Sequence, residues 1–411
     1  MSMIKIFDDL SKKIIKDKID IEALNEFLEQ EENENNFIID FNGEIIKKEG
    51  EITEESRENN REWYYNIYNK VYNWLSKIIK IVKNILPSSK ENDICGIINI
   101  GNNCYLNAGL QILSRCHSLI KLLLKSDYEK DELISLFVEA MIILIFRKDK
   151  FYNPTKFIKC FCKRNKDFVI GQQNCSQDFI RTILRNINDI YEKNKRYEYY
   201  TPKNFEKKAY KAYLLENNIF PESAPYSIFS GILKIQINGI CTNCKEKINN
   251  YSFSNFVDQH IYLNSFNTAC KFSDVLRKNI GQGNKASLRC PKCKEKLYLN
   301  SISKFIKIPE IFIFTLERFL VRNTVPIDPD EFINVYDLID DACDIDKNQC
   351  FYELFAINIR KGKDLSFGHE ICQIKQKDNW YTIDDGDYYK RQREYKEYSY
   401  GLFYRKIQIH N

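Results

Sequence analysis

The cysteines of this sequence are numerous, and its histidines are few, which narrows the chemistry it could perform. The 411 residues include 14 cysteines and 4 histidines. The N-terminus lacks the apolar stretch and small-residue cleavage site of a secretory signal, so we expect a reducing compartment, the cytoplasm or the nucleus. In that setting cysteines act as thiols, metal ligands or nucleophiles more often than as disulfides.

Cys104 has the surroundings of a nucleophile. It lies in the run GIINIGNNCYLNAGLQIL, residues 96–113. The glycines indicate a turn and residues 105–113 a helix, so Cys104 falls at or near a helix N-terminus, where backbone N–H groups favour a thiolate. The nearby amide of Asn99 is a candidate donor to a developing oxyanion. A buried, inert thiol is the commoner role of a single cysteine, so this run alone does not establish a nucleophile.

A cysteine nucleophile needs an imidazole base, and three of the four histidines suit that role poorly. His410 is the penultimate residue, and His260 lies beside an apolar, strand-like run. His117 falls in the same predicted helical stretch as Cys104, where a straight helix would hold the two about 20 Å apart. His369 is therefore the strongest candidate for the base.

The sequence after His369 also supplies an acceptor for its ring. The run HEICQIK from His369 and the run WYTIDD are strand-like and are separated by a turn at residues 376–379. Two antiparallel strands would bring Asp384 or Asp385 back beside His369, where a carboxylate fixes the ring tautomer. The alternative is a surface histidine near two solvated aspartates.

Four other cysteines have the spacing of a metal site. Two C-x-x-C pairs, Cys241–Cys244 and Cys290–Cys293, can complete a tetrahedral four-thiolate site that suits one zinc ion. Such a closed site predicts a structural rather than a catalytic metal. The 45 residues between the pairs predict extended hairpins with the metal at their far end. Four incidental thiols, or a site that has lost its metal, are the alternatives.

The elements that must position these residues change in character along the chain. Residues 96–215 are mostly helical in pattern, with apolar periodic stretches at 108–124, 129–146 and 176–191. From about residue 228 short strand-like runs follow one another to the C-terminus. This order predicts an α+β fold in which a helical lobe packs on an antiparallel sheet.

Residues 1–90 are predicted to be an N-terminal extension, separate from a domain at 91–411. Residues 26–62 contain 13 acidic and 4 basic residues and are predicted to be flexible, although 37–41 could form a strand. Residues 63–86 have the apolar spacing of a basic amphipathic helix. That helix packs on the following domain or contacts a membrane or a protein partner. The apolar run at 134–146 is too short to span a membrane.

Six motifs, in order, resemble the ubiquitin-specific proteases, the papain-like deubiquitinases. Residues 96–111 resemble that family's cysteine box and GHEICQIKQKDNWYTIDD its histidine box. QNCSQDFI (173–180) is loosely similar to its Q-Q-D-A-x-E-F-L motif. IFSG before CTNC, IPEIFIFTLERF and YGLFYRK resemble the entry to its zinc-bearing fingers and two of its strands. The resemblance covers about residues 95–406.

The resemblance implies a right-hand fold, with a helical thumb, a palm sheet, and fingers holding the four-cysteine zinc ribbon. It makes 91–411 the catalytic domain of a thiol protease that cuts after the C-terminal glycine of ubiquitin, with ubiquitin and ubiquitinated proteins as partners. The implied catalytic residues are Cys104 as nucleophile, His369 as base, Asp384 as its acceptor, Asn99 as oxyanion donor and Asp385 as support. Gln173 and Asn174 fall at positions near the ubiquitin tail.

Two departures from the family pattern leave an alternative open. Cys175 stands where the motif has an aspartate, which could weaken the grip on the basic tail of ubiquitin. Glu370 replaces an aromatic residue after His369 and could raise the pKa of the base or alter the polarity of the cleft. The alternative is therefore a catalytically weak or inactive ubiquitin-binding scaffold. A ubiquitin-like modifier also remains open as the substrate. The net charge of +5 is too small to favour nucleic acid as a partner.

Overall fold

The computed structural model describes most of the chain from residue 94 onward. The described residues are 94–124, 128–146, 151–192, 224–281, 284–319, 323–362, 368–376, 379–390 and 397–407, with the strands β1 (Phe37–Ile39) and β2 (Ile45–Lys47). β1 and β2 pair antiparallel, so the strand predicted within 37–41 is present. The acidic segment 26–62 otherwise lies outside the described residues, as does the basic helix 63–86. In the described part of the chain, no helix is long and apolar enough to cross a membrane.

The chain divides into two compact units. The first comprises residues 1–100, 113–170 and 385–388, and the second comprises residues 101–112, 171–384 and 389–411. The first unit contains α5 (His117–Leu124), a 3₁₀ turn (Tyr128–Lys130), α6 (Glu132–Phe146), α7 (Thr155–Arg164) and the parallel pair β3 (Gly96–Ile97) and β4 (Phe151–Tyr152). Its core includes the stacked rings of Phe157 and Phe161, with centroids 5.9 Å apart.

The helical stretch predicted at 108–124 is two helices. α4 (Cys104–Leu113) ends at a turn, and α5 begins at His117. The turn is closed by backbone hydrogen bonds from Cys116 N to Leu113 O and from Leu119 N to Cys116 O, both 3.0 Å. The premise that His117 shares a helix with Cys104 was therefore wrong. The periodic pattern did not show the break because residues on both sides of the turn are buried.

The second unit is built on a large sheet. Its strand order is β17-β16-β15-β14-β18-β11-β7, with β13 also paired to β14. The bounds are β7 (Gln259–Tyr262), β11 (Ile311–Glu317), β13 (Phe332–Asn334), β14 (Phe351–Lys361), β15 (His369–Gln376), β16 (Asn379–Asp384), β17 (Asp387–Lys390) and β18 (Ser399–Ile407). The strand-like runs of the C-terminal half are thus strands. A short parallel pair, β8 (Cys270–Lys271) and β12 (Ile327–Asp328), lies outside this sheet.

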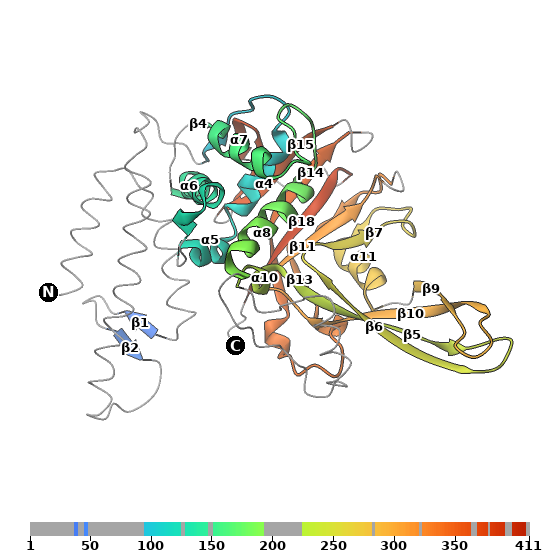
Figure 1. The fold of residues 1–411 in the computed structure, drawn as a ribbon. Helices are drawn as coiled ribbons and strands as arrows, with labels where there is room; N and C mark the ends of the chain where they lie inside the picture. The colour runs from blue at the N-terminus through green and yellow to red at the C-terminus, as the bar shows by residue number, and fades with distance from the viewer. Residues whose placement is uncertain are drawn as a thin grey trace, which may run out of the picture. The chain divides into compact units, whose positions relative to one another are not determined.

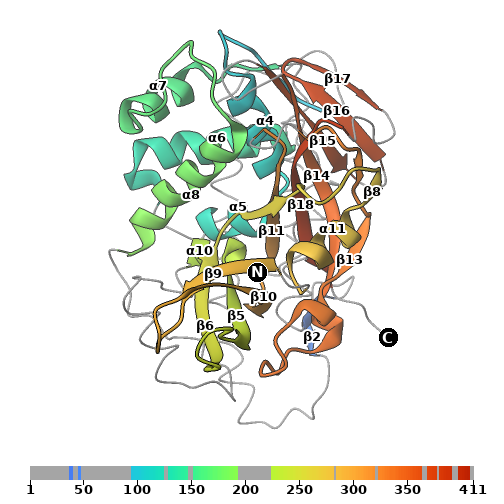
Figure 2. The ribbon, with the colours of Figure 1, turned by 90° about the vertical axis from the view of Figure 1, so that its right-hand side faces the viewer.

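The two faces of this sheet differ because side chains alternate along each strand. Phe312 and Phe314 of β11 and Tyr404 of β18 belong to an aromatic and aliphatic core that also includes residues of α11 (Phe272–Asn279). The opposite face meets α8 (Ser176–Glu192), which α10 (Ala224–Phe229) contacts in turn. Figure 2 shows α8 and α11 on different sides of the sheet. The contact between α8 and the sheet is polar as well as apolar, and it lies beside the strand that carries His369.

A second sheet carries the four paired cysteines. Its order is β6-β5-β10-β9, with bounds β5 (Gly231–Ile240), β6 (Lys247–Phe256), β9 (Asn284–Arg289) and β10 (Lys296–Lys307). β5 and β6 form one long hairpin, β9 and β10 form another, and β5 pairs with β10 in the middle. Figure 1 shows both hairpins running out to one tip. The extended hairpins predicted from the 45-residue gap are therefore present.

Candidate active site and metal site

Cys104 is the first residue of α4, as the sequence predicted. The preceding turn uses two residues with left-handed backbone, Gly101 (φ 123°) and Asn102 (φ 51°). Asn102 Nδ2 fixes this turn by donating to the carbonyl oxygen of Gly171 at 2.8 Å. The Cys104 side chain is buried at the start of this helix.

His369 and Asp384 meet at one end of a β-hairpin. β15 and β16 pair antiparallel, with Gln376 opposite Asn379, so the first residue of β15 lies near the last residue of β16. The Nε2 atom of His369 lies 2.6 Å from Oδ1 of Asp384. The hairpin therefore brings a carboxylate to the ring as predicted, and that carboxylate belongs to Asp384 rather than to Asp385.

The imidazole is linked to both the acid and the thiol. The hydrogen bond that His369 donates to Asp384 is the largest cause that raises the pKa of His369 to about 10, and a hydrogen bond with Cys104 is the next. The same bond to His369 lowers the pKa of Asp384. The three side chains form a Cys–His–Asp chain in which a protonated ring can neutralise a thiolate.

Asn99 and Asp385 are joined to each other. Asn99 Nδ2 donates to Asp385 Oδ2 at 2.8 Å, and the backbone of Asp385 accepts from Ile97 N at 2.9 Å. Asp385 has left-handed backbone (φ 52°), and a Cβ added to Gly96 would come within 2.3 Å of the carbonyl oxygen of Gly386. This explains the glycine that opens the cysteine box. The oxyanion role of Asn99 and the supporting role of Asp385 stay predictions.

Gln173 and Asn174 make contacts within the protein. The amide of Gln173 donates to Gly368 O at 2.7 Å and accepts from Gly368 N at 3.0 Å. Asn174 Oδ1 accepts from the backbone of Cys175 at 2.9 Å, and its carbonyl oxygen accepts from Arg360 at 3.1 Å. Contact with a substrate tail stays a prediction for both residues. The structure adds that Gln173 holds the residue just before the base.

Glu370 does not act on the base in the way that its place in the sequence suggests. It is buried on β15, and its carboxylate binds Arg360 and Ser176. His369 precedes it on a strand, so the two side chains point to opposite faces. The groups that raise the pKa of His369 most are Asp384 and Cys104. The structure therefore does not support the possibility that Glu370 raises that pKa.

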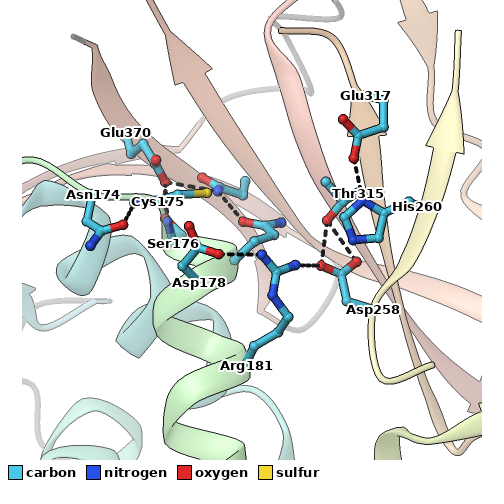
Figure 3. A network of polar contacts seen from close by, with 12 residues as sticks. Asn174, Cys175, Ser176, Asp178, Arg181, Asp258, His260, Thr315, Glu317 and Glu370 are labelled. Atoms are coloured by element: carbon cyan, nitrogen blue, oxygen red, sulfur yellow. Dashed lines mark hydrogen bonds and ion pairs between the residues drawn. The ribbon is translucent and has the colours of Figure 1, made fainter. Parts of the chain in front are cut away.

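A second polar network, which the sequence analysis missed, joins α8 to the sheet (Figure 3). Arg181 forms ion pairs with Asp178 and with Asp258, whose side chain is only 2% exposed. Thr315 Oγ1 donates to Asp258 Oδ1 at 2.7 Å. Burial raises the pKa of Asp258, and the charge of Arg181 opposes that rise. These residues are far apart in the sequence, and only the packing of α8 on β7 and β11 brings them together.

His260 belongs to this second region. Its Nδ1 contacts Glu317 across the parallel pair β7 and β11, and that hydrogen bond is the main cause that raises its pKa. Each histidine thus has a carboxylate partner, but only His369 is also linked to Cys104. The role of His369 as the base stays a prediction.

The four paired cysteines converge at the tip of the second sheet. Cys241 Sγ lies 3.5 Å from Cys293 Sγ, and Cys244 Sγ lies 3.5 Å from Cys290 Sγ. All four sulfurs lie within 4.8 Å of one another. Four sulfurs at the Zn–S distance of about 2.3 Å would be about 3.8 Å apart in a tetrahedron, so the cluster fits one zinc ion.

Both cysteine pairs have the same backbone geometry. Each first cysteine donates its backbone N–H to the residue five positions later and accepts from the residue four positions later, at 2.8 and 3.0 Å. That fourth residue has left-handed backbone in both, Lys245 (φ 60°) and Lys294 (φ 64°). The two loops therefore present their four sulfurs to one point.

Comparison with known proteins agrees with this geometry. A sequence model of the ubiquitin carboxyl-terminal hydrolase family matches residues 95–404. Ubiquitin carboxyl-terminal hydrolase 12 of Salmo salar is 25% identical over 324 residues, which span 75% of this chain and 84% of that protein. A chain of the yeast SAGA DUBm structure is 20% identical, with a TM-score of 0.57 over 80% of this chain and 72% of that one.

The family match covers well over half of the chain. It confirms the α+β, papain-like fold class with a four-cysteine cluster of the zinc-ribbon kind. The structural likeness, at this level of identity, speaks for the fold alone. The chain belongs to the ubiquitin carboxyl-terminal hydrolase family and, within it, to the ubiquitin-specific proteases.

Proposed function

We propose that the protein is an active deubiquitinase, a thiol protease that hydrolyses the peptide or isopeptide bond after the C-terminal glycine of ubiquitin. The observation that carries the proposal is that His369, hydrogen-bonded to Asp384, lies close enough to Cys104 at the start of α4 for the thiol to act on its pKa. Family membership supports the substrate class. Ubiquitin and ubiquitinated proteins are the proposed partners.

Cys104, His369 and one water molecule supply the electron pairs and protons that the reaction needs. The Cys104 thiolate attacks the glycine carbonyl carbon, and the carbonyl electron pair moves to the oxygen. Collapse of this intermediate breaks the C–N bond, while His369 gives its proton to the leaving amine and a thioester remains. His369 then takes a proton from water, the resulting hydroxide attacks the thioester, and the C–S bond breaks. The thiolate and the imidazolium are thereby restored.

The remaining predicted site residues assist these steps. Asn99 is proposed to donate a hydrogen bond to the oxyanion, and its bond to Asp385 restricts the rotation of its amide. Asp384 accepts from Nε2 of His369 and so presents Nδ1 to the sulfur. Gln173 and Asn174 are proposed to lie near the incoming tail.

A ubiquitin probe with a C-terminal electrophile tests the proposal. Wild-type protein should form a covalent adduct of one ubiquitin per chain, located at Cys104 by peptide mass spectrometry. Cys104→Ser should form none while keeping the wild-type circular dichroism spectrum. A folded wild-type protein that neither reacts nor cleaves di-ubiquitin, yet binds ubiquitin, would show a scaffold instead. The same electrophile on a ubiquitin-like modifier distinguishes that substrate from ubiquitin.

We also propose that Cys241, Cys244, Cys290 and Cys293 hold one structural zinc ion. The four closely spaced sulfurs and the two matching backbone loops support this. All four positions around the ion would be filled by protein ligands, so the ion would stabilise the tip of the hairpins and leave the chemistry to Cys104. Elemental analysis should find one zinc per chain. Cys290→Ser should reduce that ratio, whereas Cys343→Ser, a change at a half-buried thiol outside the cluster, should not.

A further inference from the structure

The residue that follows the base carries a buried charge. The side chains of Glu370 and Arg360 are each only 1% exposed, and they face each other directly across β15 and β14. Glu370 Oε2 also accepts from Asn358 Nδ2 at 3.1 Å. Burying a charged pair is costly unless each charge has several partners, so this pair depends on its complete set of hydrogen bonds.

The same carboxylate also closes the start of a helix. Ser176 is the first residue of α8, and its backbone N–H and hydroxyl both donate to Glu370 Oε2, the former at 3.1 Å. The N–H groups of a first helical turn lack partners within the helix, and a negative charge there also interacts favourably with the helix dipole. Glu370 therefore caps α8 from the strand that carries the base (Figure 3).

The residue that precedes the base is held from the same segment. Gln173, three residues before Ser176, makes two hydrogen bonds to the backbone of Gly368. Two further bonds attach the segment to β14, from Arg360 to Asn174 O at 3.1 Å and from Asn358 to Gln177 Oε1 at 3.0 Å. Residues 173–177 are thus joined to the two strands at almost every position.

His369 lies between these two anchors and has a demanding geometry to satisfy. One ring nitrogen must meet Asp384 and the other must meet Cys104. A misplacement of about 1 Å in a catalytic group can reduce the rate about 100-fold. The side chain of His369 is 44% exposed, so packing around the ring alone does not hold it. Its position depends on the backbone to which it is attached.

We propose that Glu370 is a positioning residue, which fixes the backbone of His369 by tying β15 to the N-terminus of α8. The inference rests on the proposed function, in which His369 is the base. Gln173 holds the other side of His369 and acts in the same way.

Glu370→Gln removes the charge and keeps the size of the side chain. A matched control is Glu353→Gln on β14, because Glu353 is also largely buried and accepts from Arg405 at 2.7 Å and from Lys375 at 2.7 Å. Both variants break a partly or fully buried ion pair on the same sheet. Only the first ion pair lies next to the base. Rates are divided by the folded fraction, so that a loss of stability does not imitate a loss of catalysis.

The first measurement needs no ubiquitin. Cys104 is labelled briefly with iodoacetamide, and the labelled Cys104 peptide is quantified by mass spectrometry. The extent of labelling measures the fraction of Cys104 present as thiolate, which a protonated His369 favours. Asp384 and Cys104 are the groups that face His369 and govern its pKa. In Glu370→Gln the ring of His369 should be displaced from Asp384 and from Cys104. The ratio of labelling at pH 6 to labelling at pH 9 should therefore fall at least about threefold, because an unpaired thiol ionises near pH 8.5.

The second measurement is turnover of a ubiquitin C-terminal fluorogenic substrate. Glu370→Gln should lose 10- to 100-fold in kcat with a KM within about threefold of wild type, whereas Glu353→Gln should retain the wild-type kcat. If the wild type labels normally but does not turn over ubiquitin, the proposed function fails while the labelling still tests Glu370. A Glu370→Gln variant with the labelling ratio and kcat of Glu353→Gln would overturn the positioning role.

A second variant keeps the test valid if Glu370→Gln does not fold. Arg360→Met with Glu370→Leu replaces the buried pair by apolar side chains of similar size, an exchange that often preserves or raises stability. Without the carboxylate, α8 loses the group that caps its N-terminus, and β15 loses its hydrogen bonds to Ser176. The proposal requires a stable protein with a low pH 6 labelling ratio and a low kcat. Wild-type values for both in this double variant would refute it.

Discussion

Replacing Asp384 by asparagine should lower the pH at which catalysis fails on the alkaline side. Asparagine keeps the size of the side chain and can still accept from Nε2 of His369, so the change removes mainly the charge. The hydrogen bond that His369 donates to Asp384 is the largest cause that raises the pKa of His369 to about 10, from an ordinary value of 6.5. Without that charge the ring of His369 should lose its proton at a lower pH. The Cys104 thiolate would then lose its positively charged partner at that lower pH as well.

The size of this effect is limited by solvent. The side chains of His369 and Asp384 are 44% and 40% exposed, so water and salt screen their interaction. We therefore expect the alkaline limb of kcat/KM to move down by at least one pH unit rather than by the full interval. One pH unit corresponds to about 1.4 kcal/mol.

The contribution of the His369–Asp384 pair to folding stability should also depend on pH. Because the pKa of His369 is raised on folding, its contribution is fully present below about pH 6.5 and is lost as the pH rises through about 10. The difference in melting temperature between wild type and Asp384→Asn should thus be largest near pH 6 and should shrink towards pH 10.

The assay is the pH dependence of kcat/KM for a ubiquitin C-terminal fluorogenic substrate at constant ionic strength. Asp387→Asn, on the exposed start of β17, controls for the loss of one negative charge. An unchanged alkaline limb in Asp384→Asn, together with normal folding, would refute the assignment of Asp384 as the group that sets the pKa of His369.

Three further changes probe the framework. Removal of zinc by a chelator, or Cys241→Ser, should lower the melting temperature and increase proteolysis between residues 231 and 307, with the zinc content measured in parallel. Arg181→Met should lower the free energy of unfolding, measured with urea, by about 3 kcal/mol, because it leaves the Asp258 carboxylate buried without its cation. The loss should be greater at pH 8 than at pH 5, because protonation of Asp258 removes the buried charge. Gly401→Ala should destabilise by about 1–3 kcal/mol in the same assay, since its Cβ would lie 1.8 Å from Gln177 Nε2.

The sequence was sufficient for those parts of the site that depend on local structure. Two glycines and a helical pattern placed Cys104 at a helix start, and two strand-like runs around a turn placed Asp384 beside His369. The spacing of the four cysteines likewise predicted two hairpins with a common tip. In each case the decisive contact lies within one supersecondary element, or between two that repeat the same pattern.

The sequence was not sufficient where a contact depends on packing. Asp258 and Arg181 are 77 positions apart, and Asp258 has no pattern that marks it as buried. The break between α4 and α5 was hidden because both helices are apolar on the sides that the turn connects. Glu370 was interpreted from its neighbour in the sequence, although a strand places neighbouring side chains on opposite faces.

The two departures that favoured an inactive scaffold meet at one contact in the structure. Cys175 is buried near Glu370, and the carboxylate contributes to raising the pKa of its thiol to about 12, after burial itself. An aspartate at position 175, as in the family motif, would bring a second negative charge to a buried site that already holds Glu370. The absence of one carboxylate and the presence of the other are therefore physically linked. In this chain the negative charge at the start of α8 comes from Glu370, on the strand that carries His369. Neither departure removes Cys104, His369 or Asp384 from the chain.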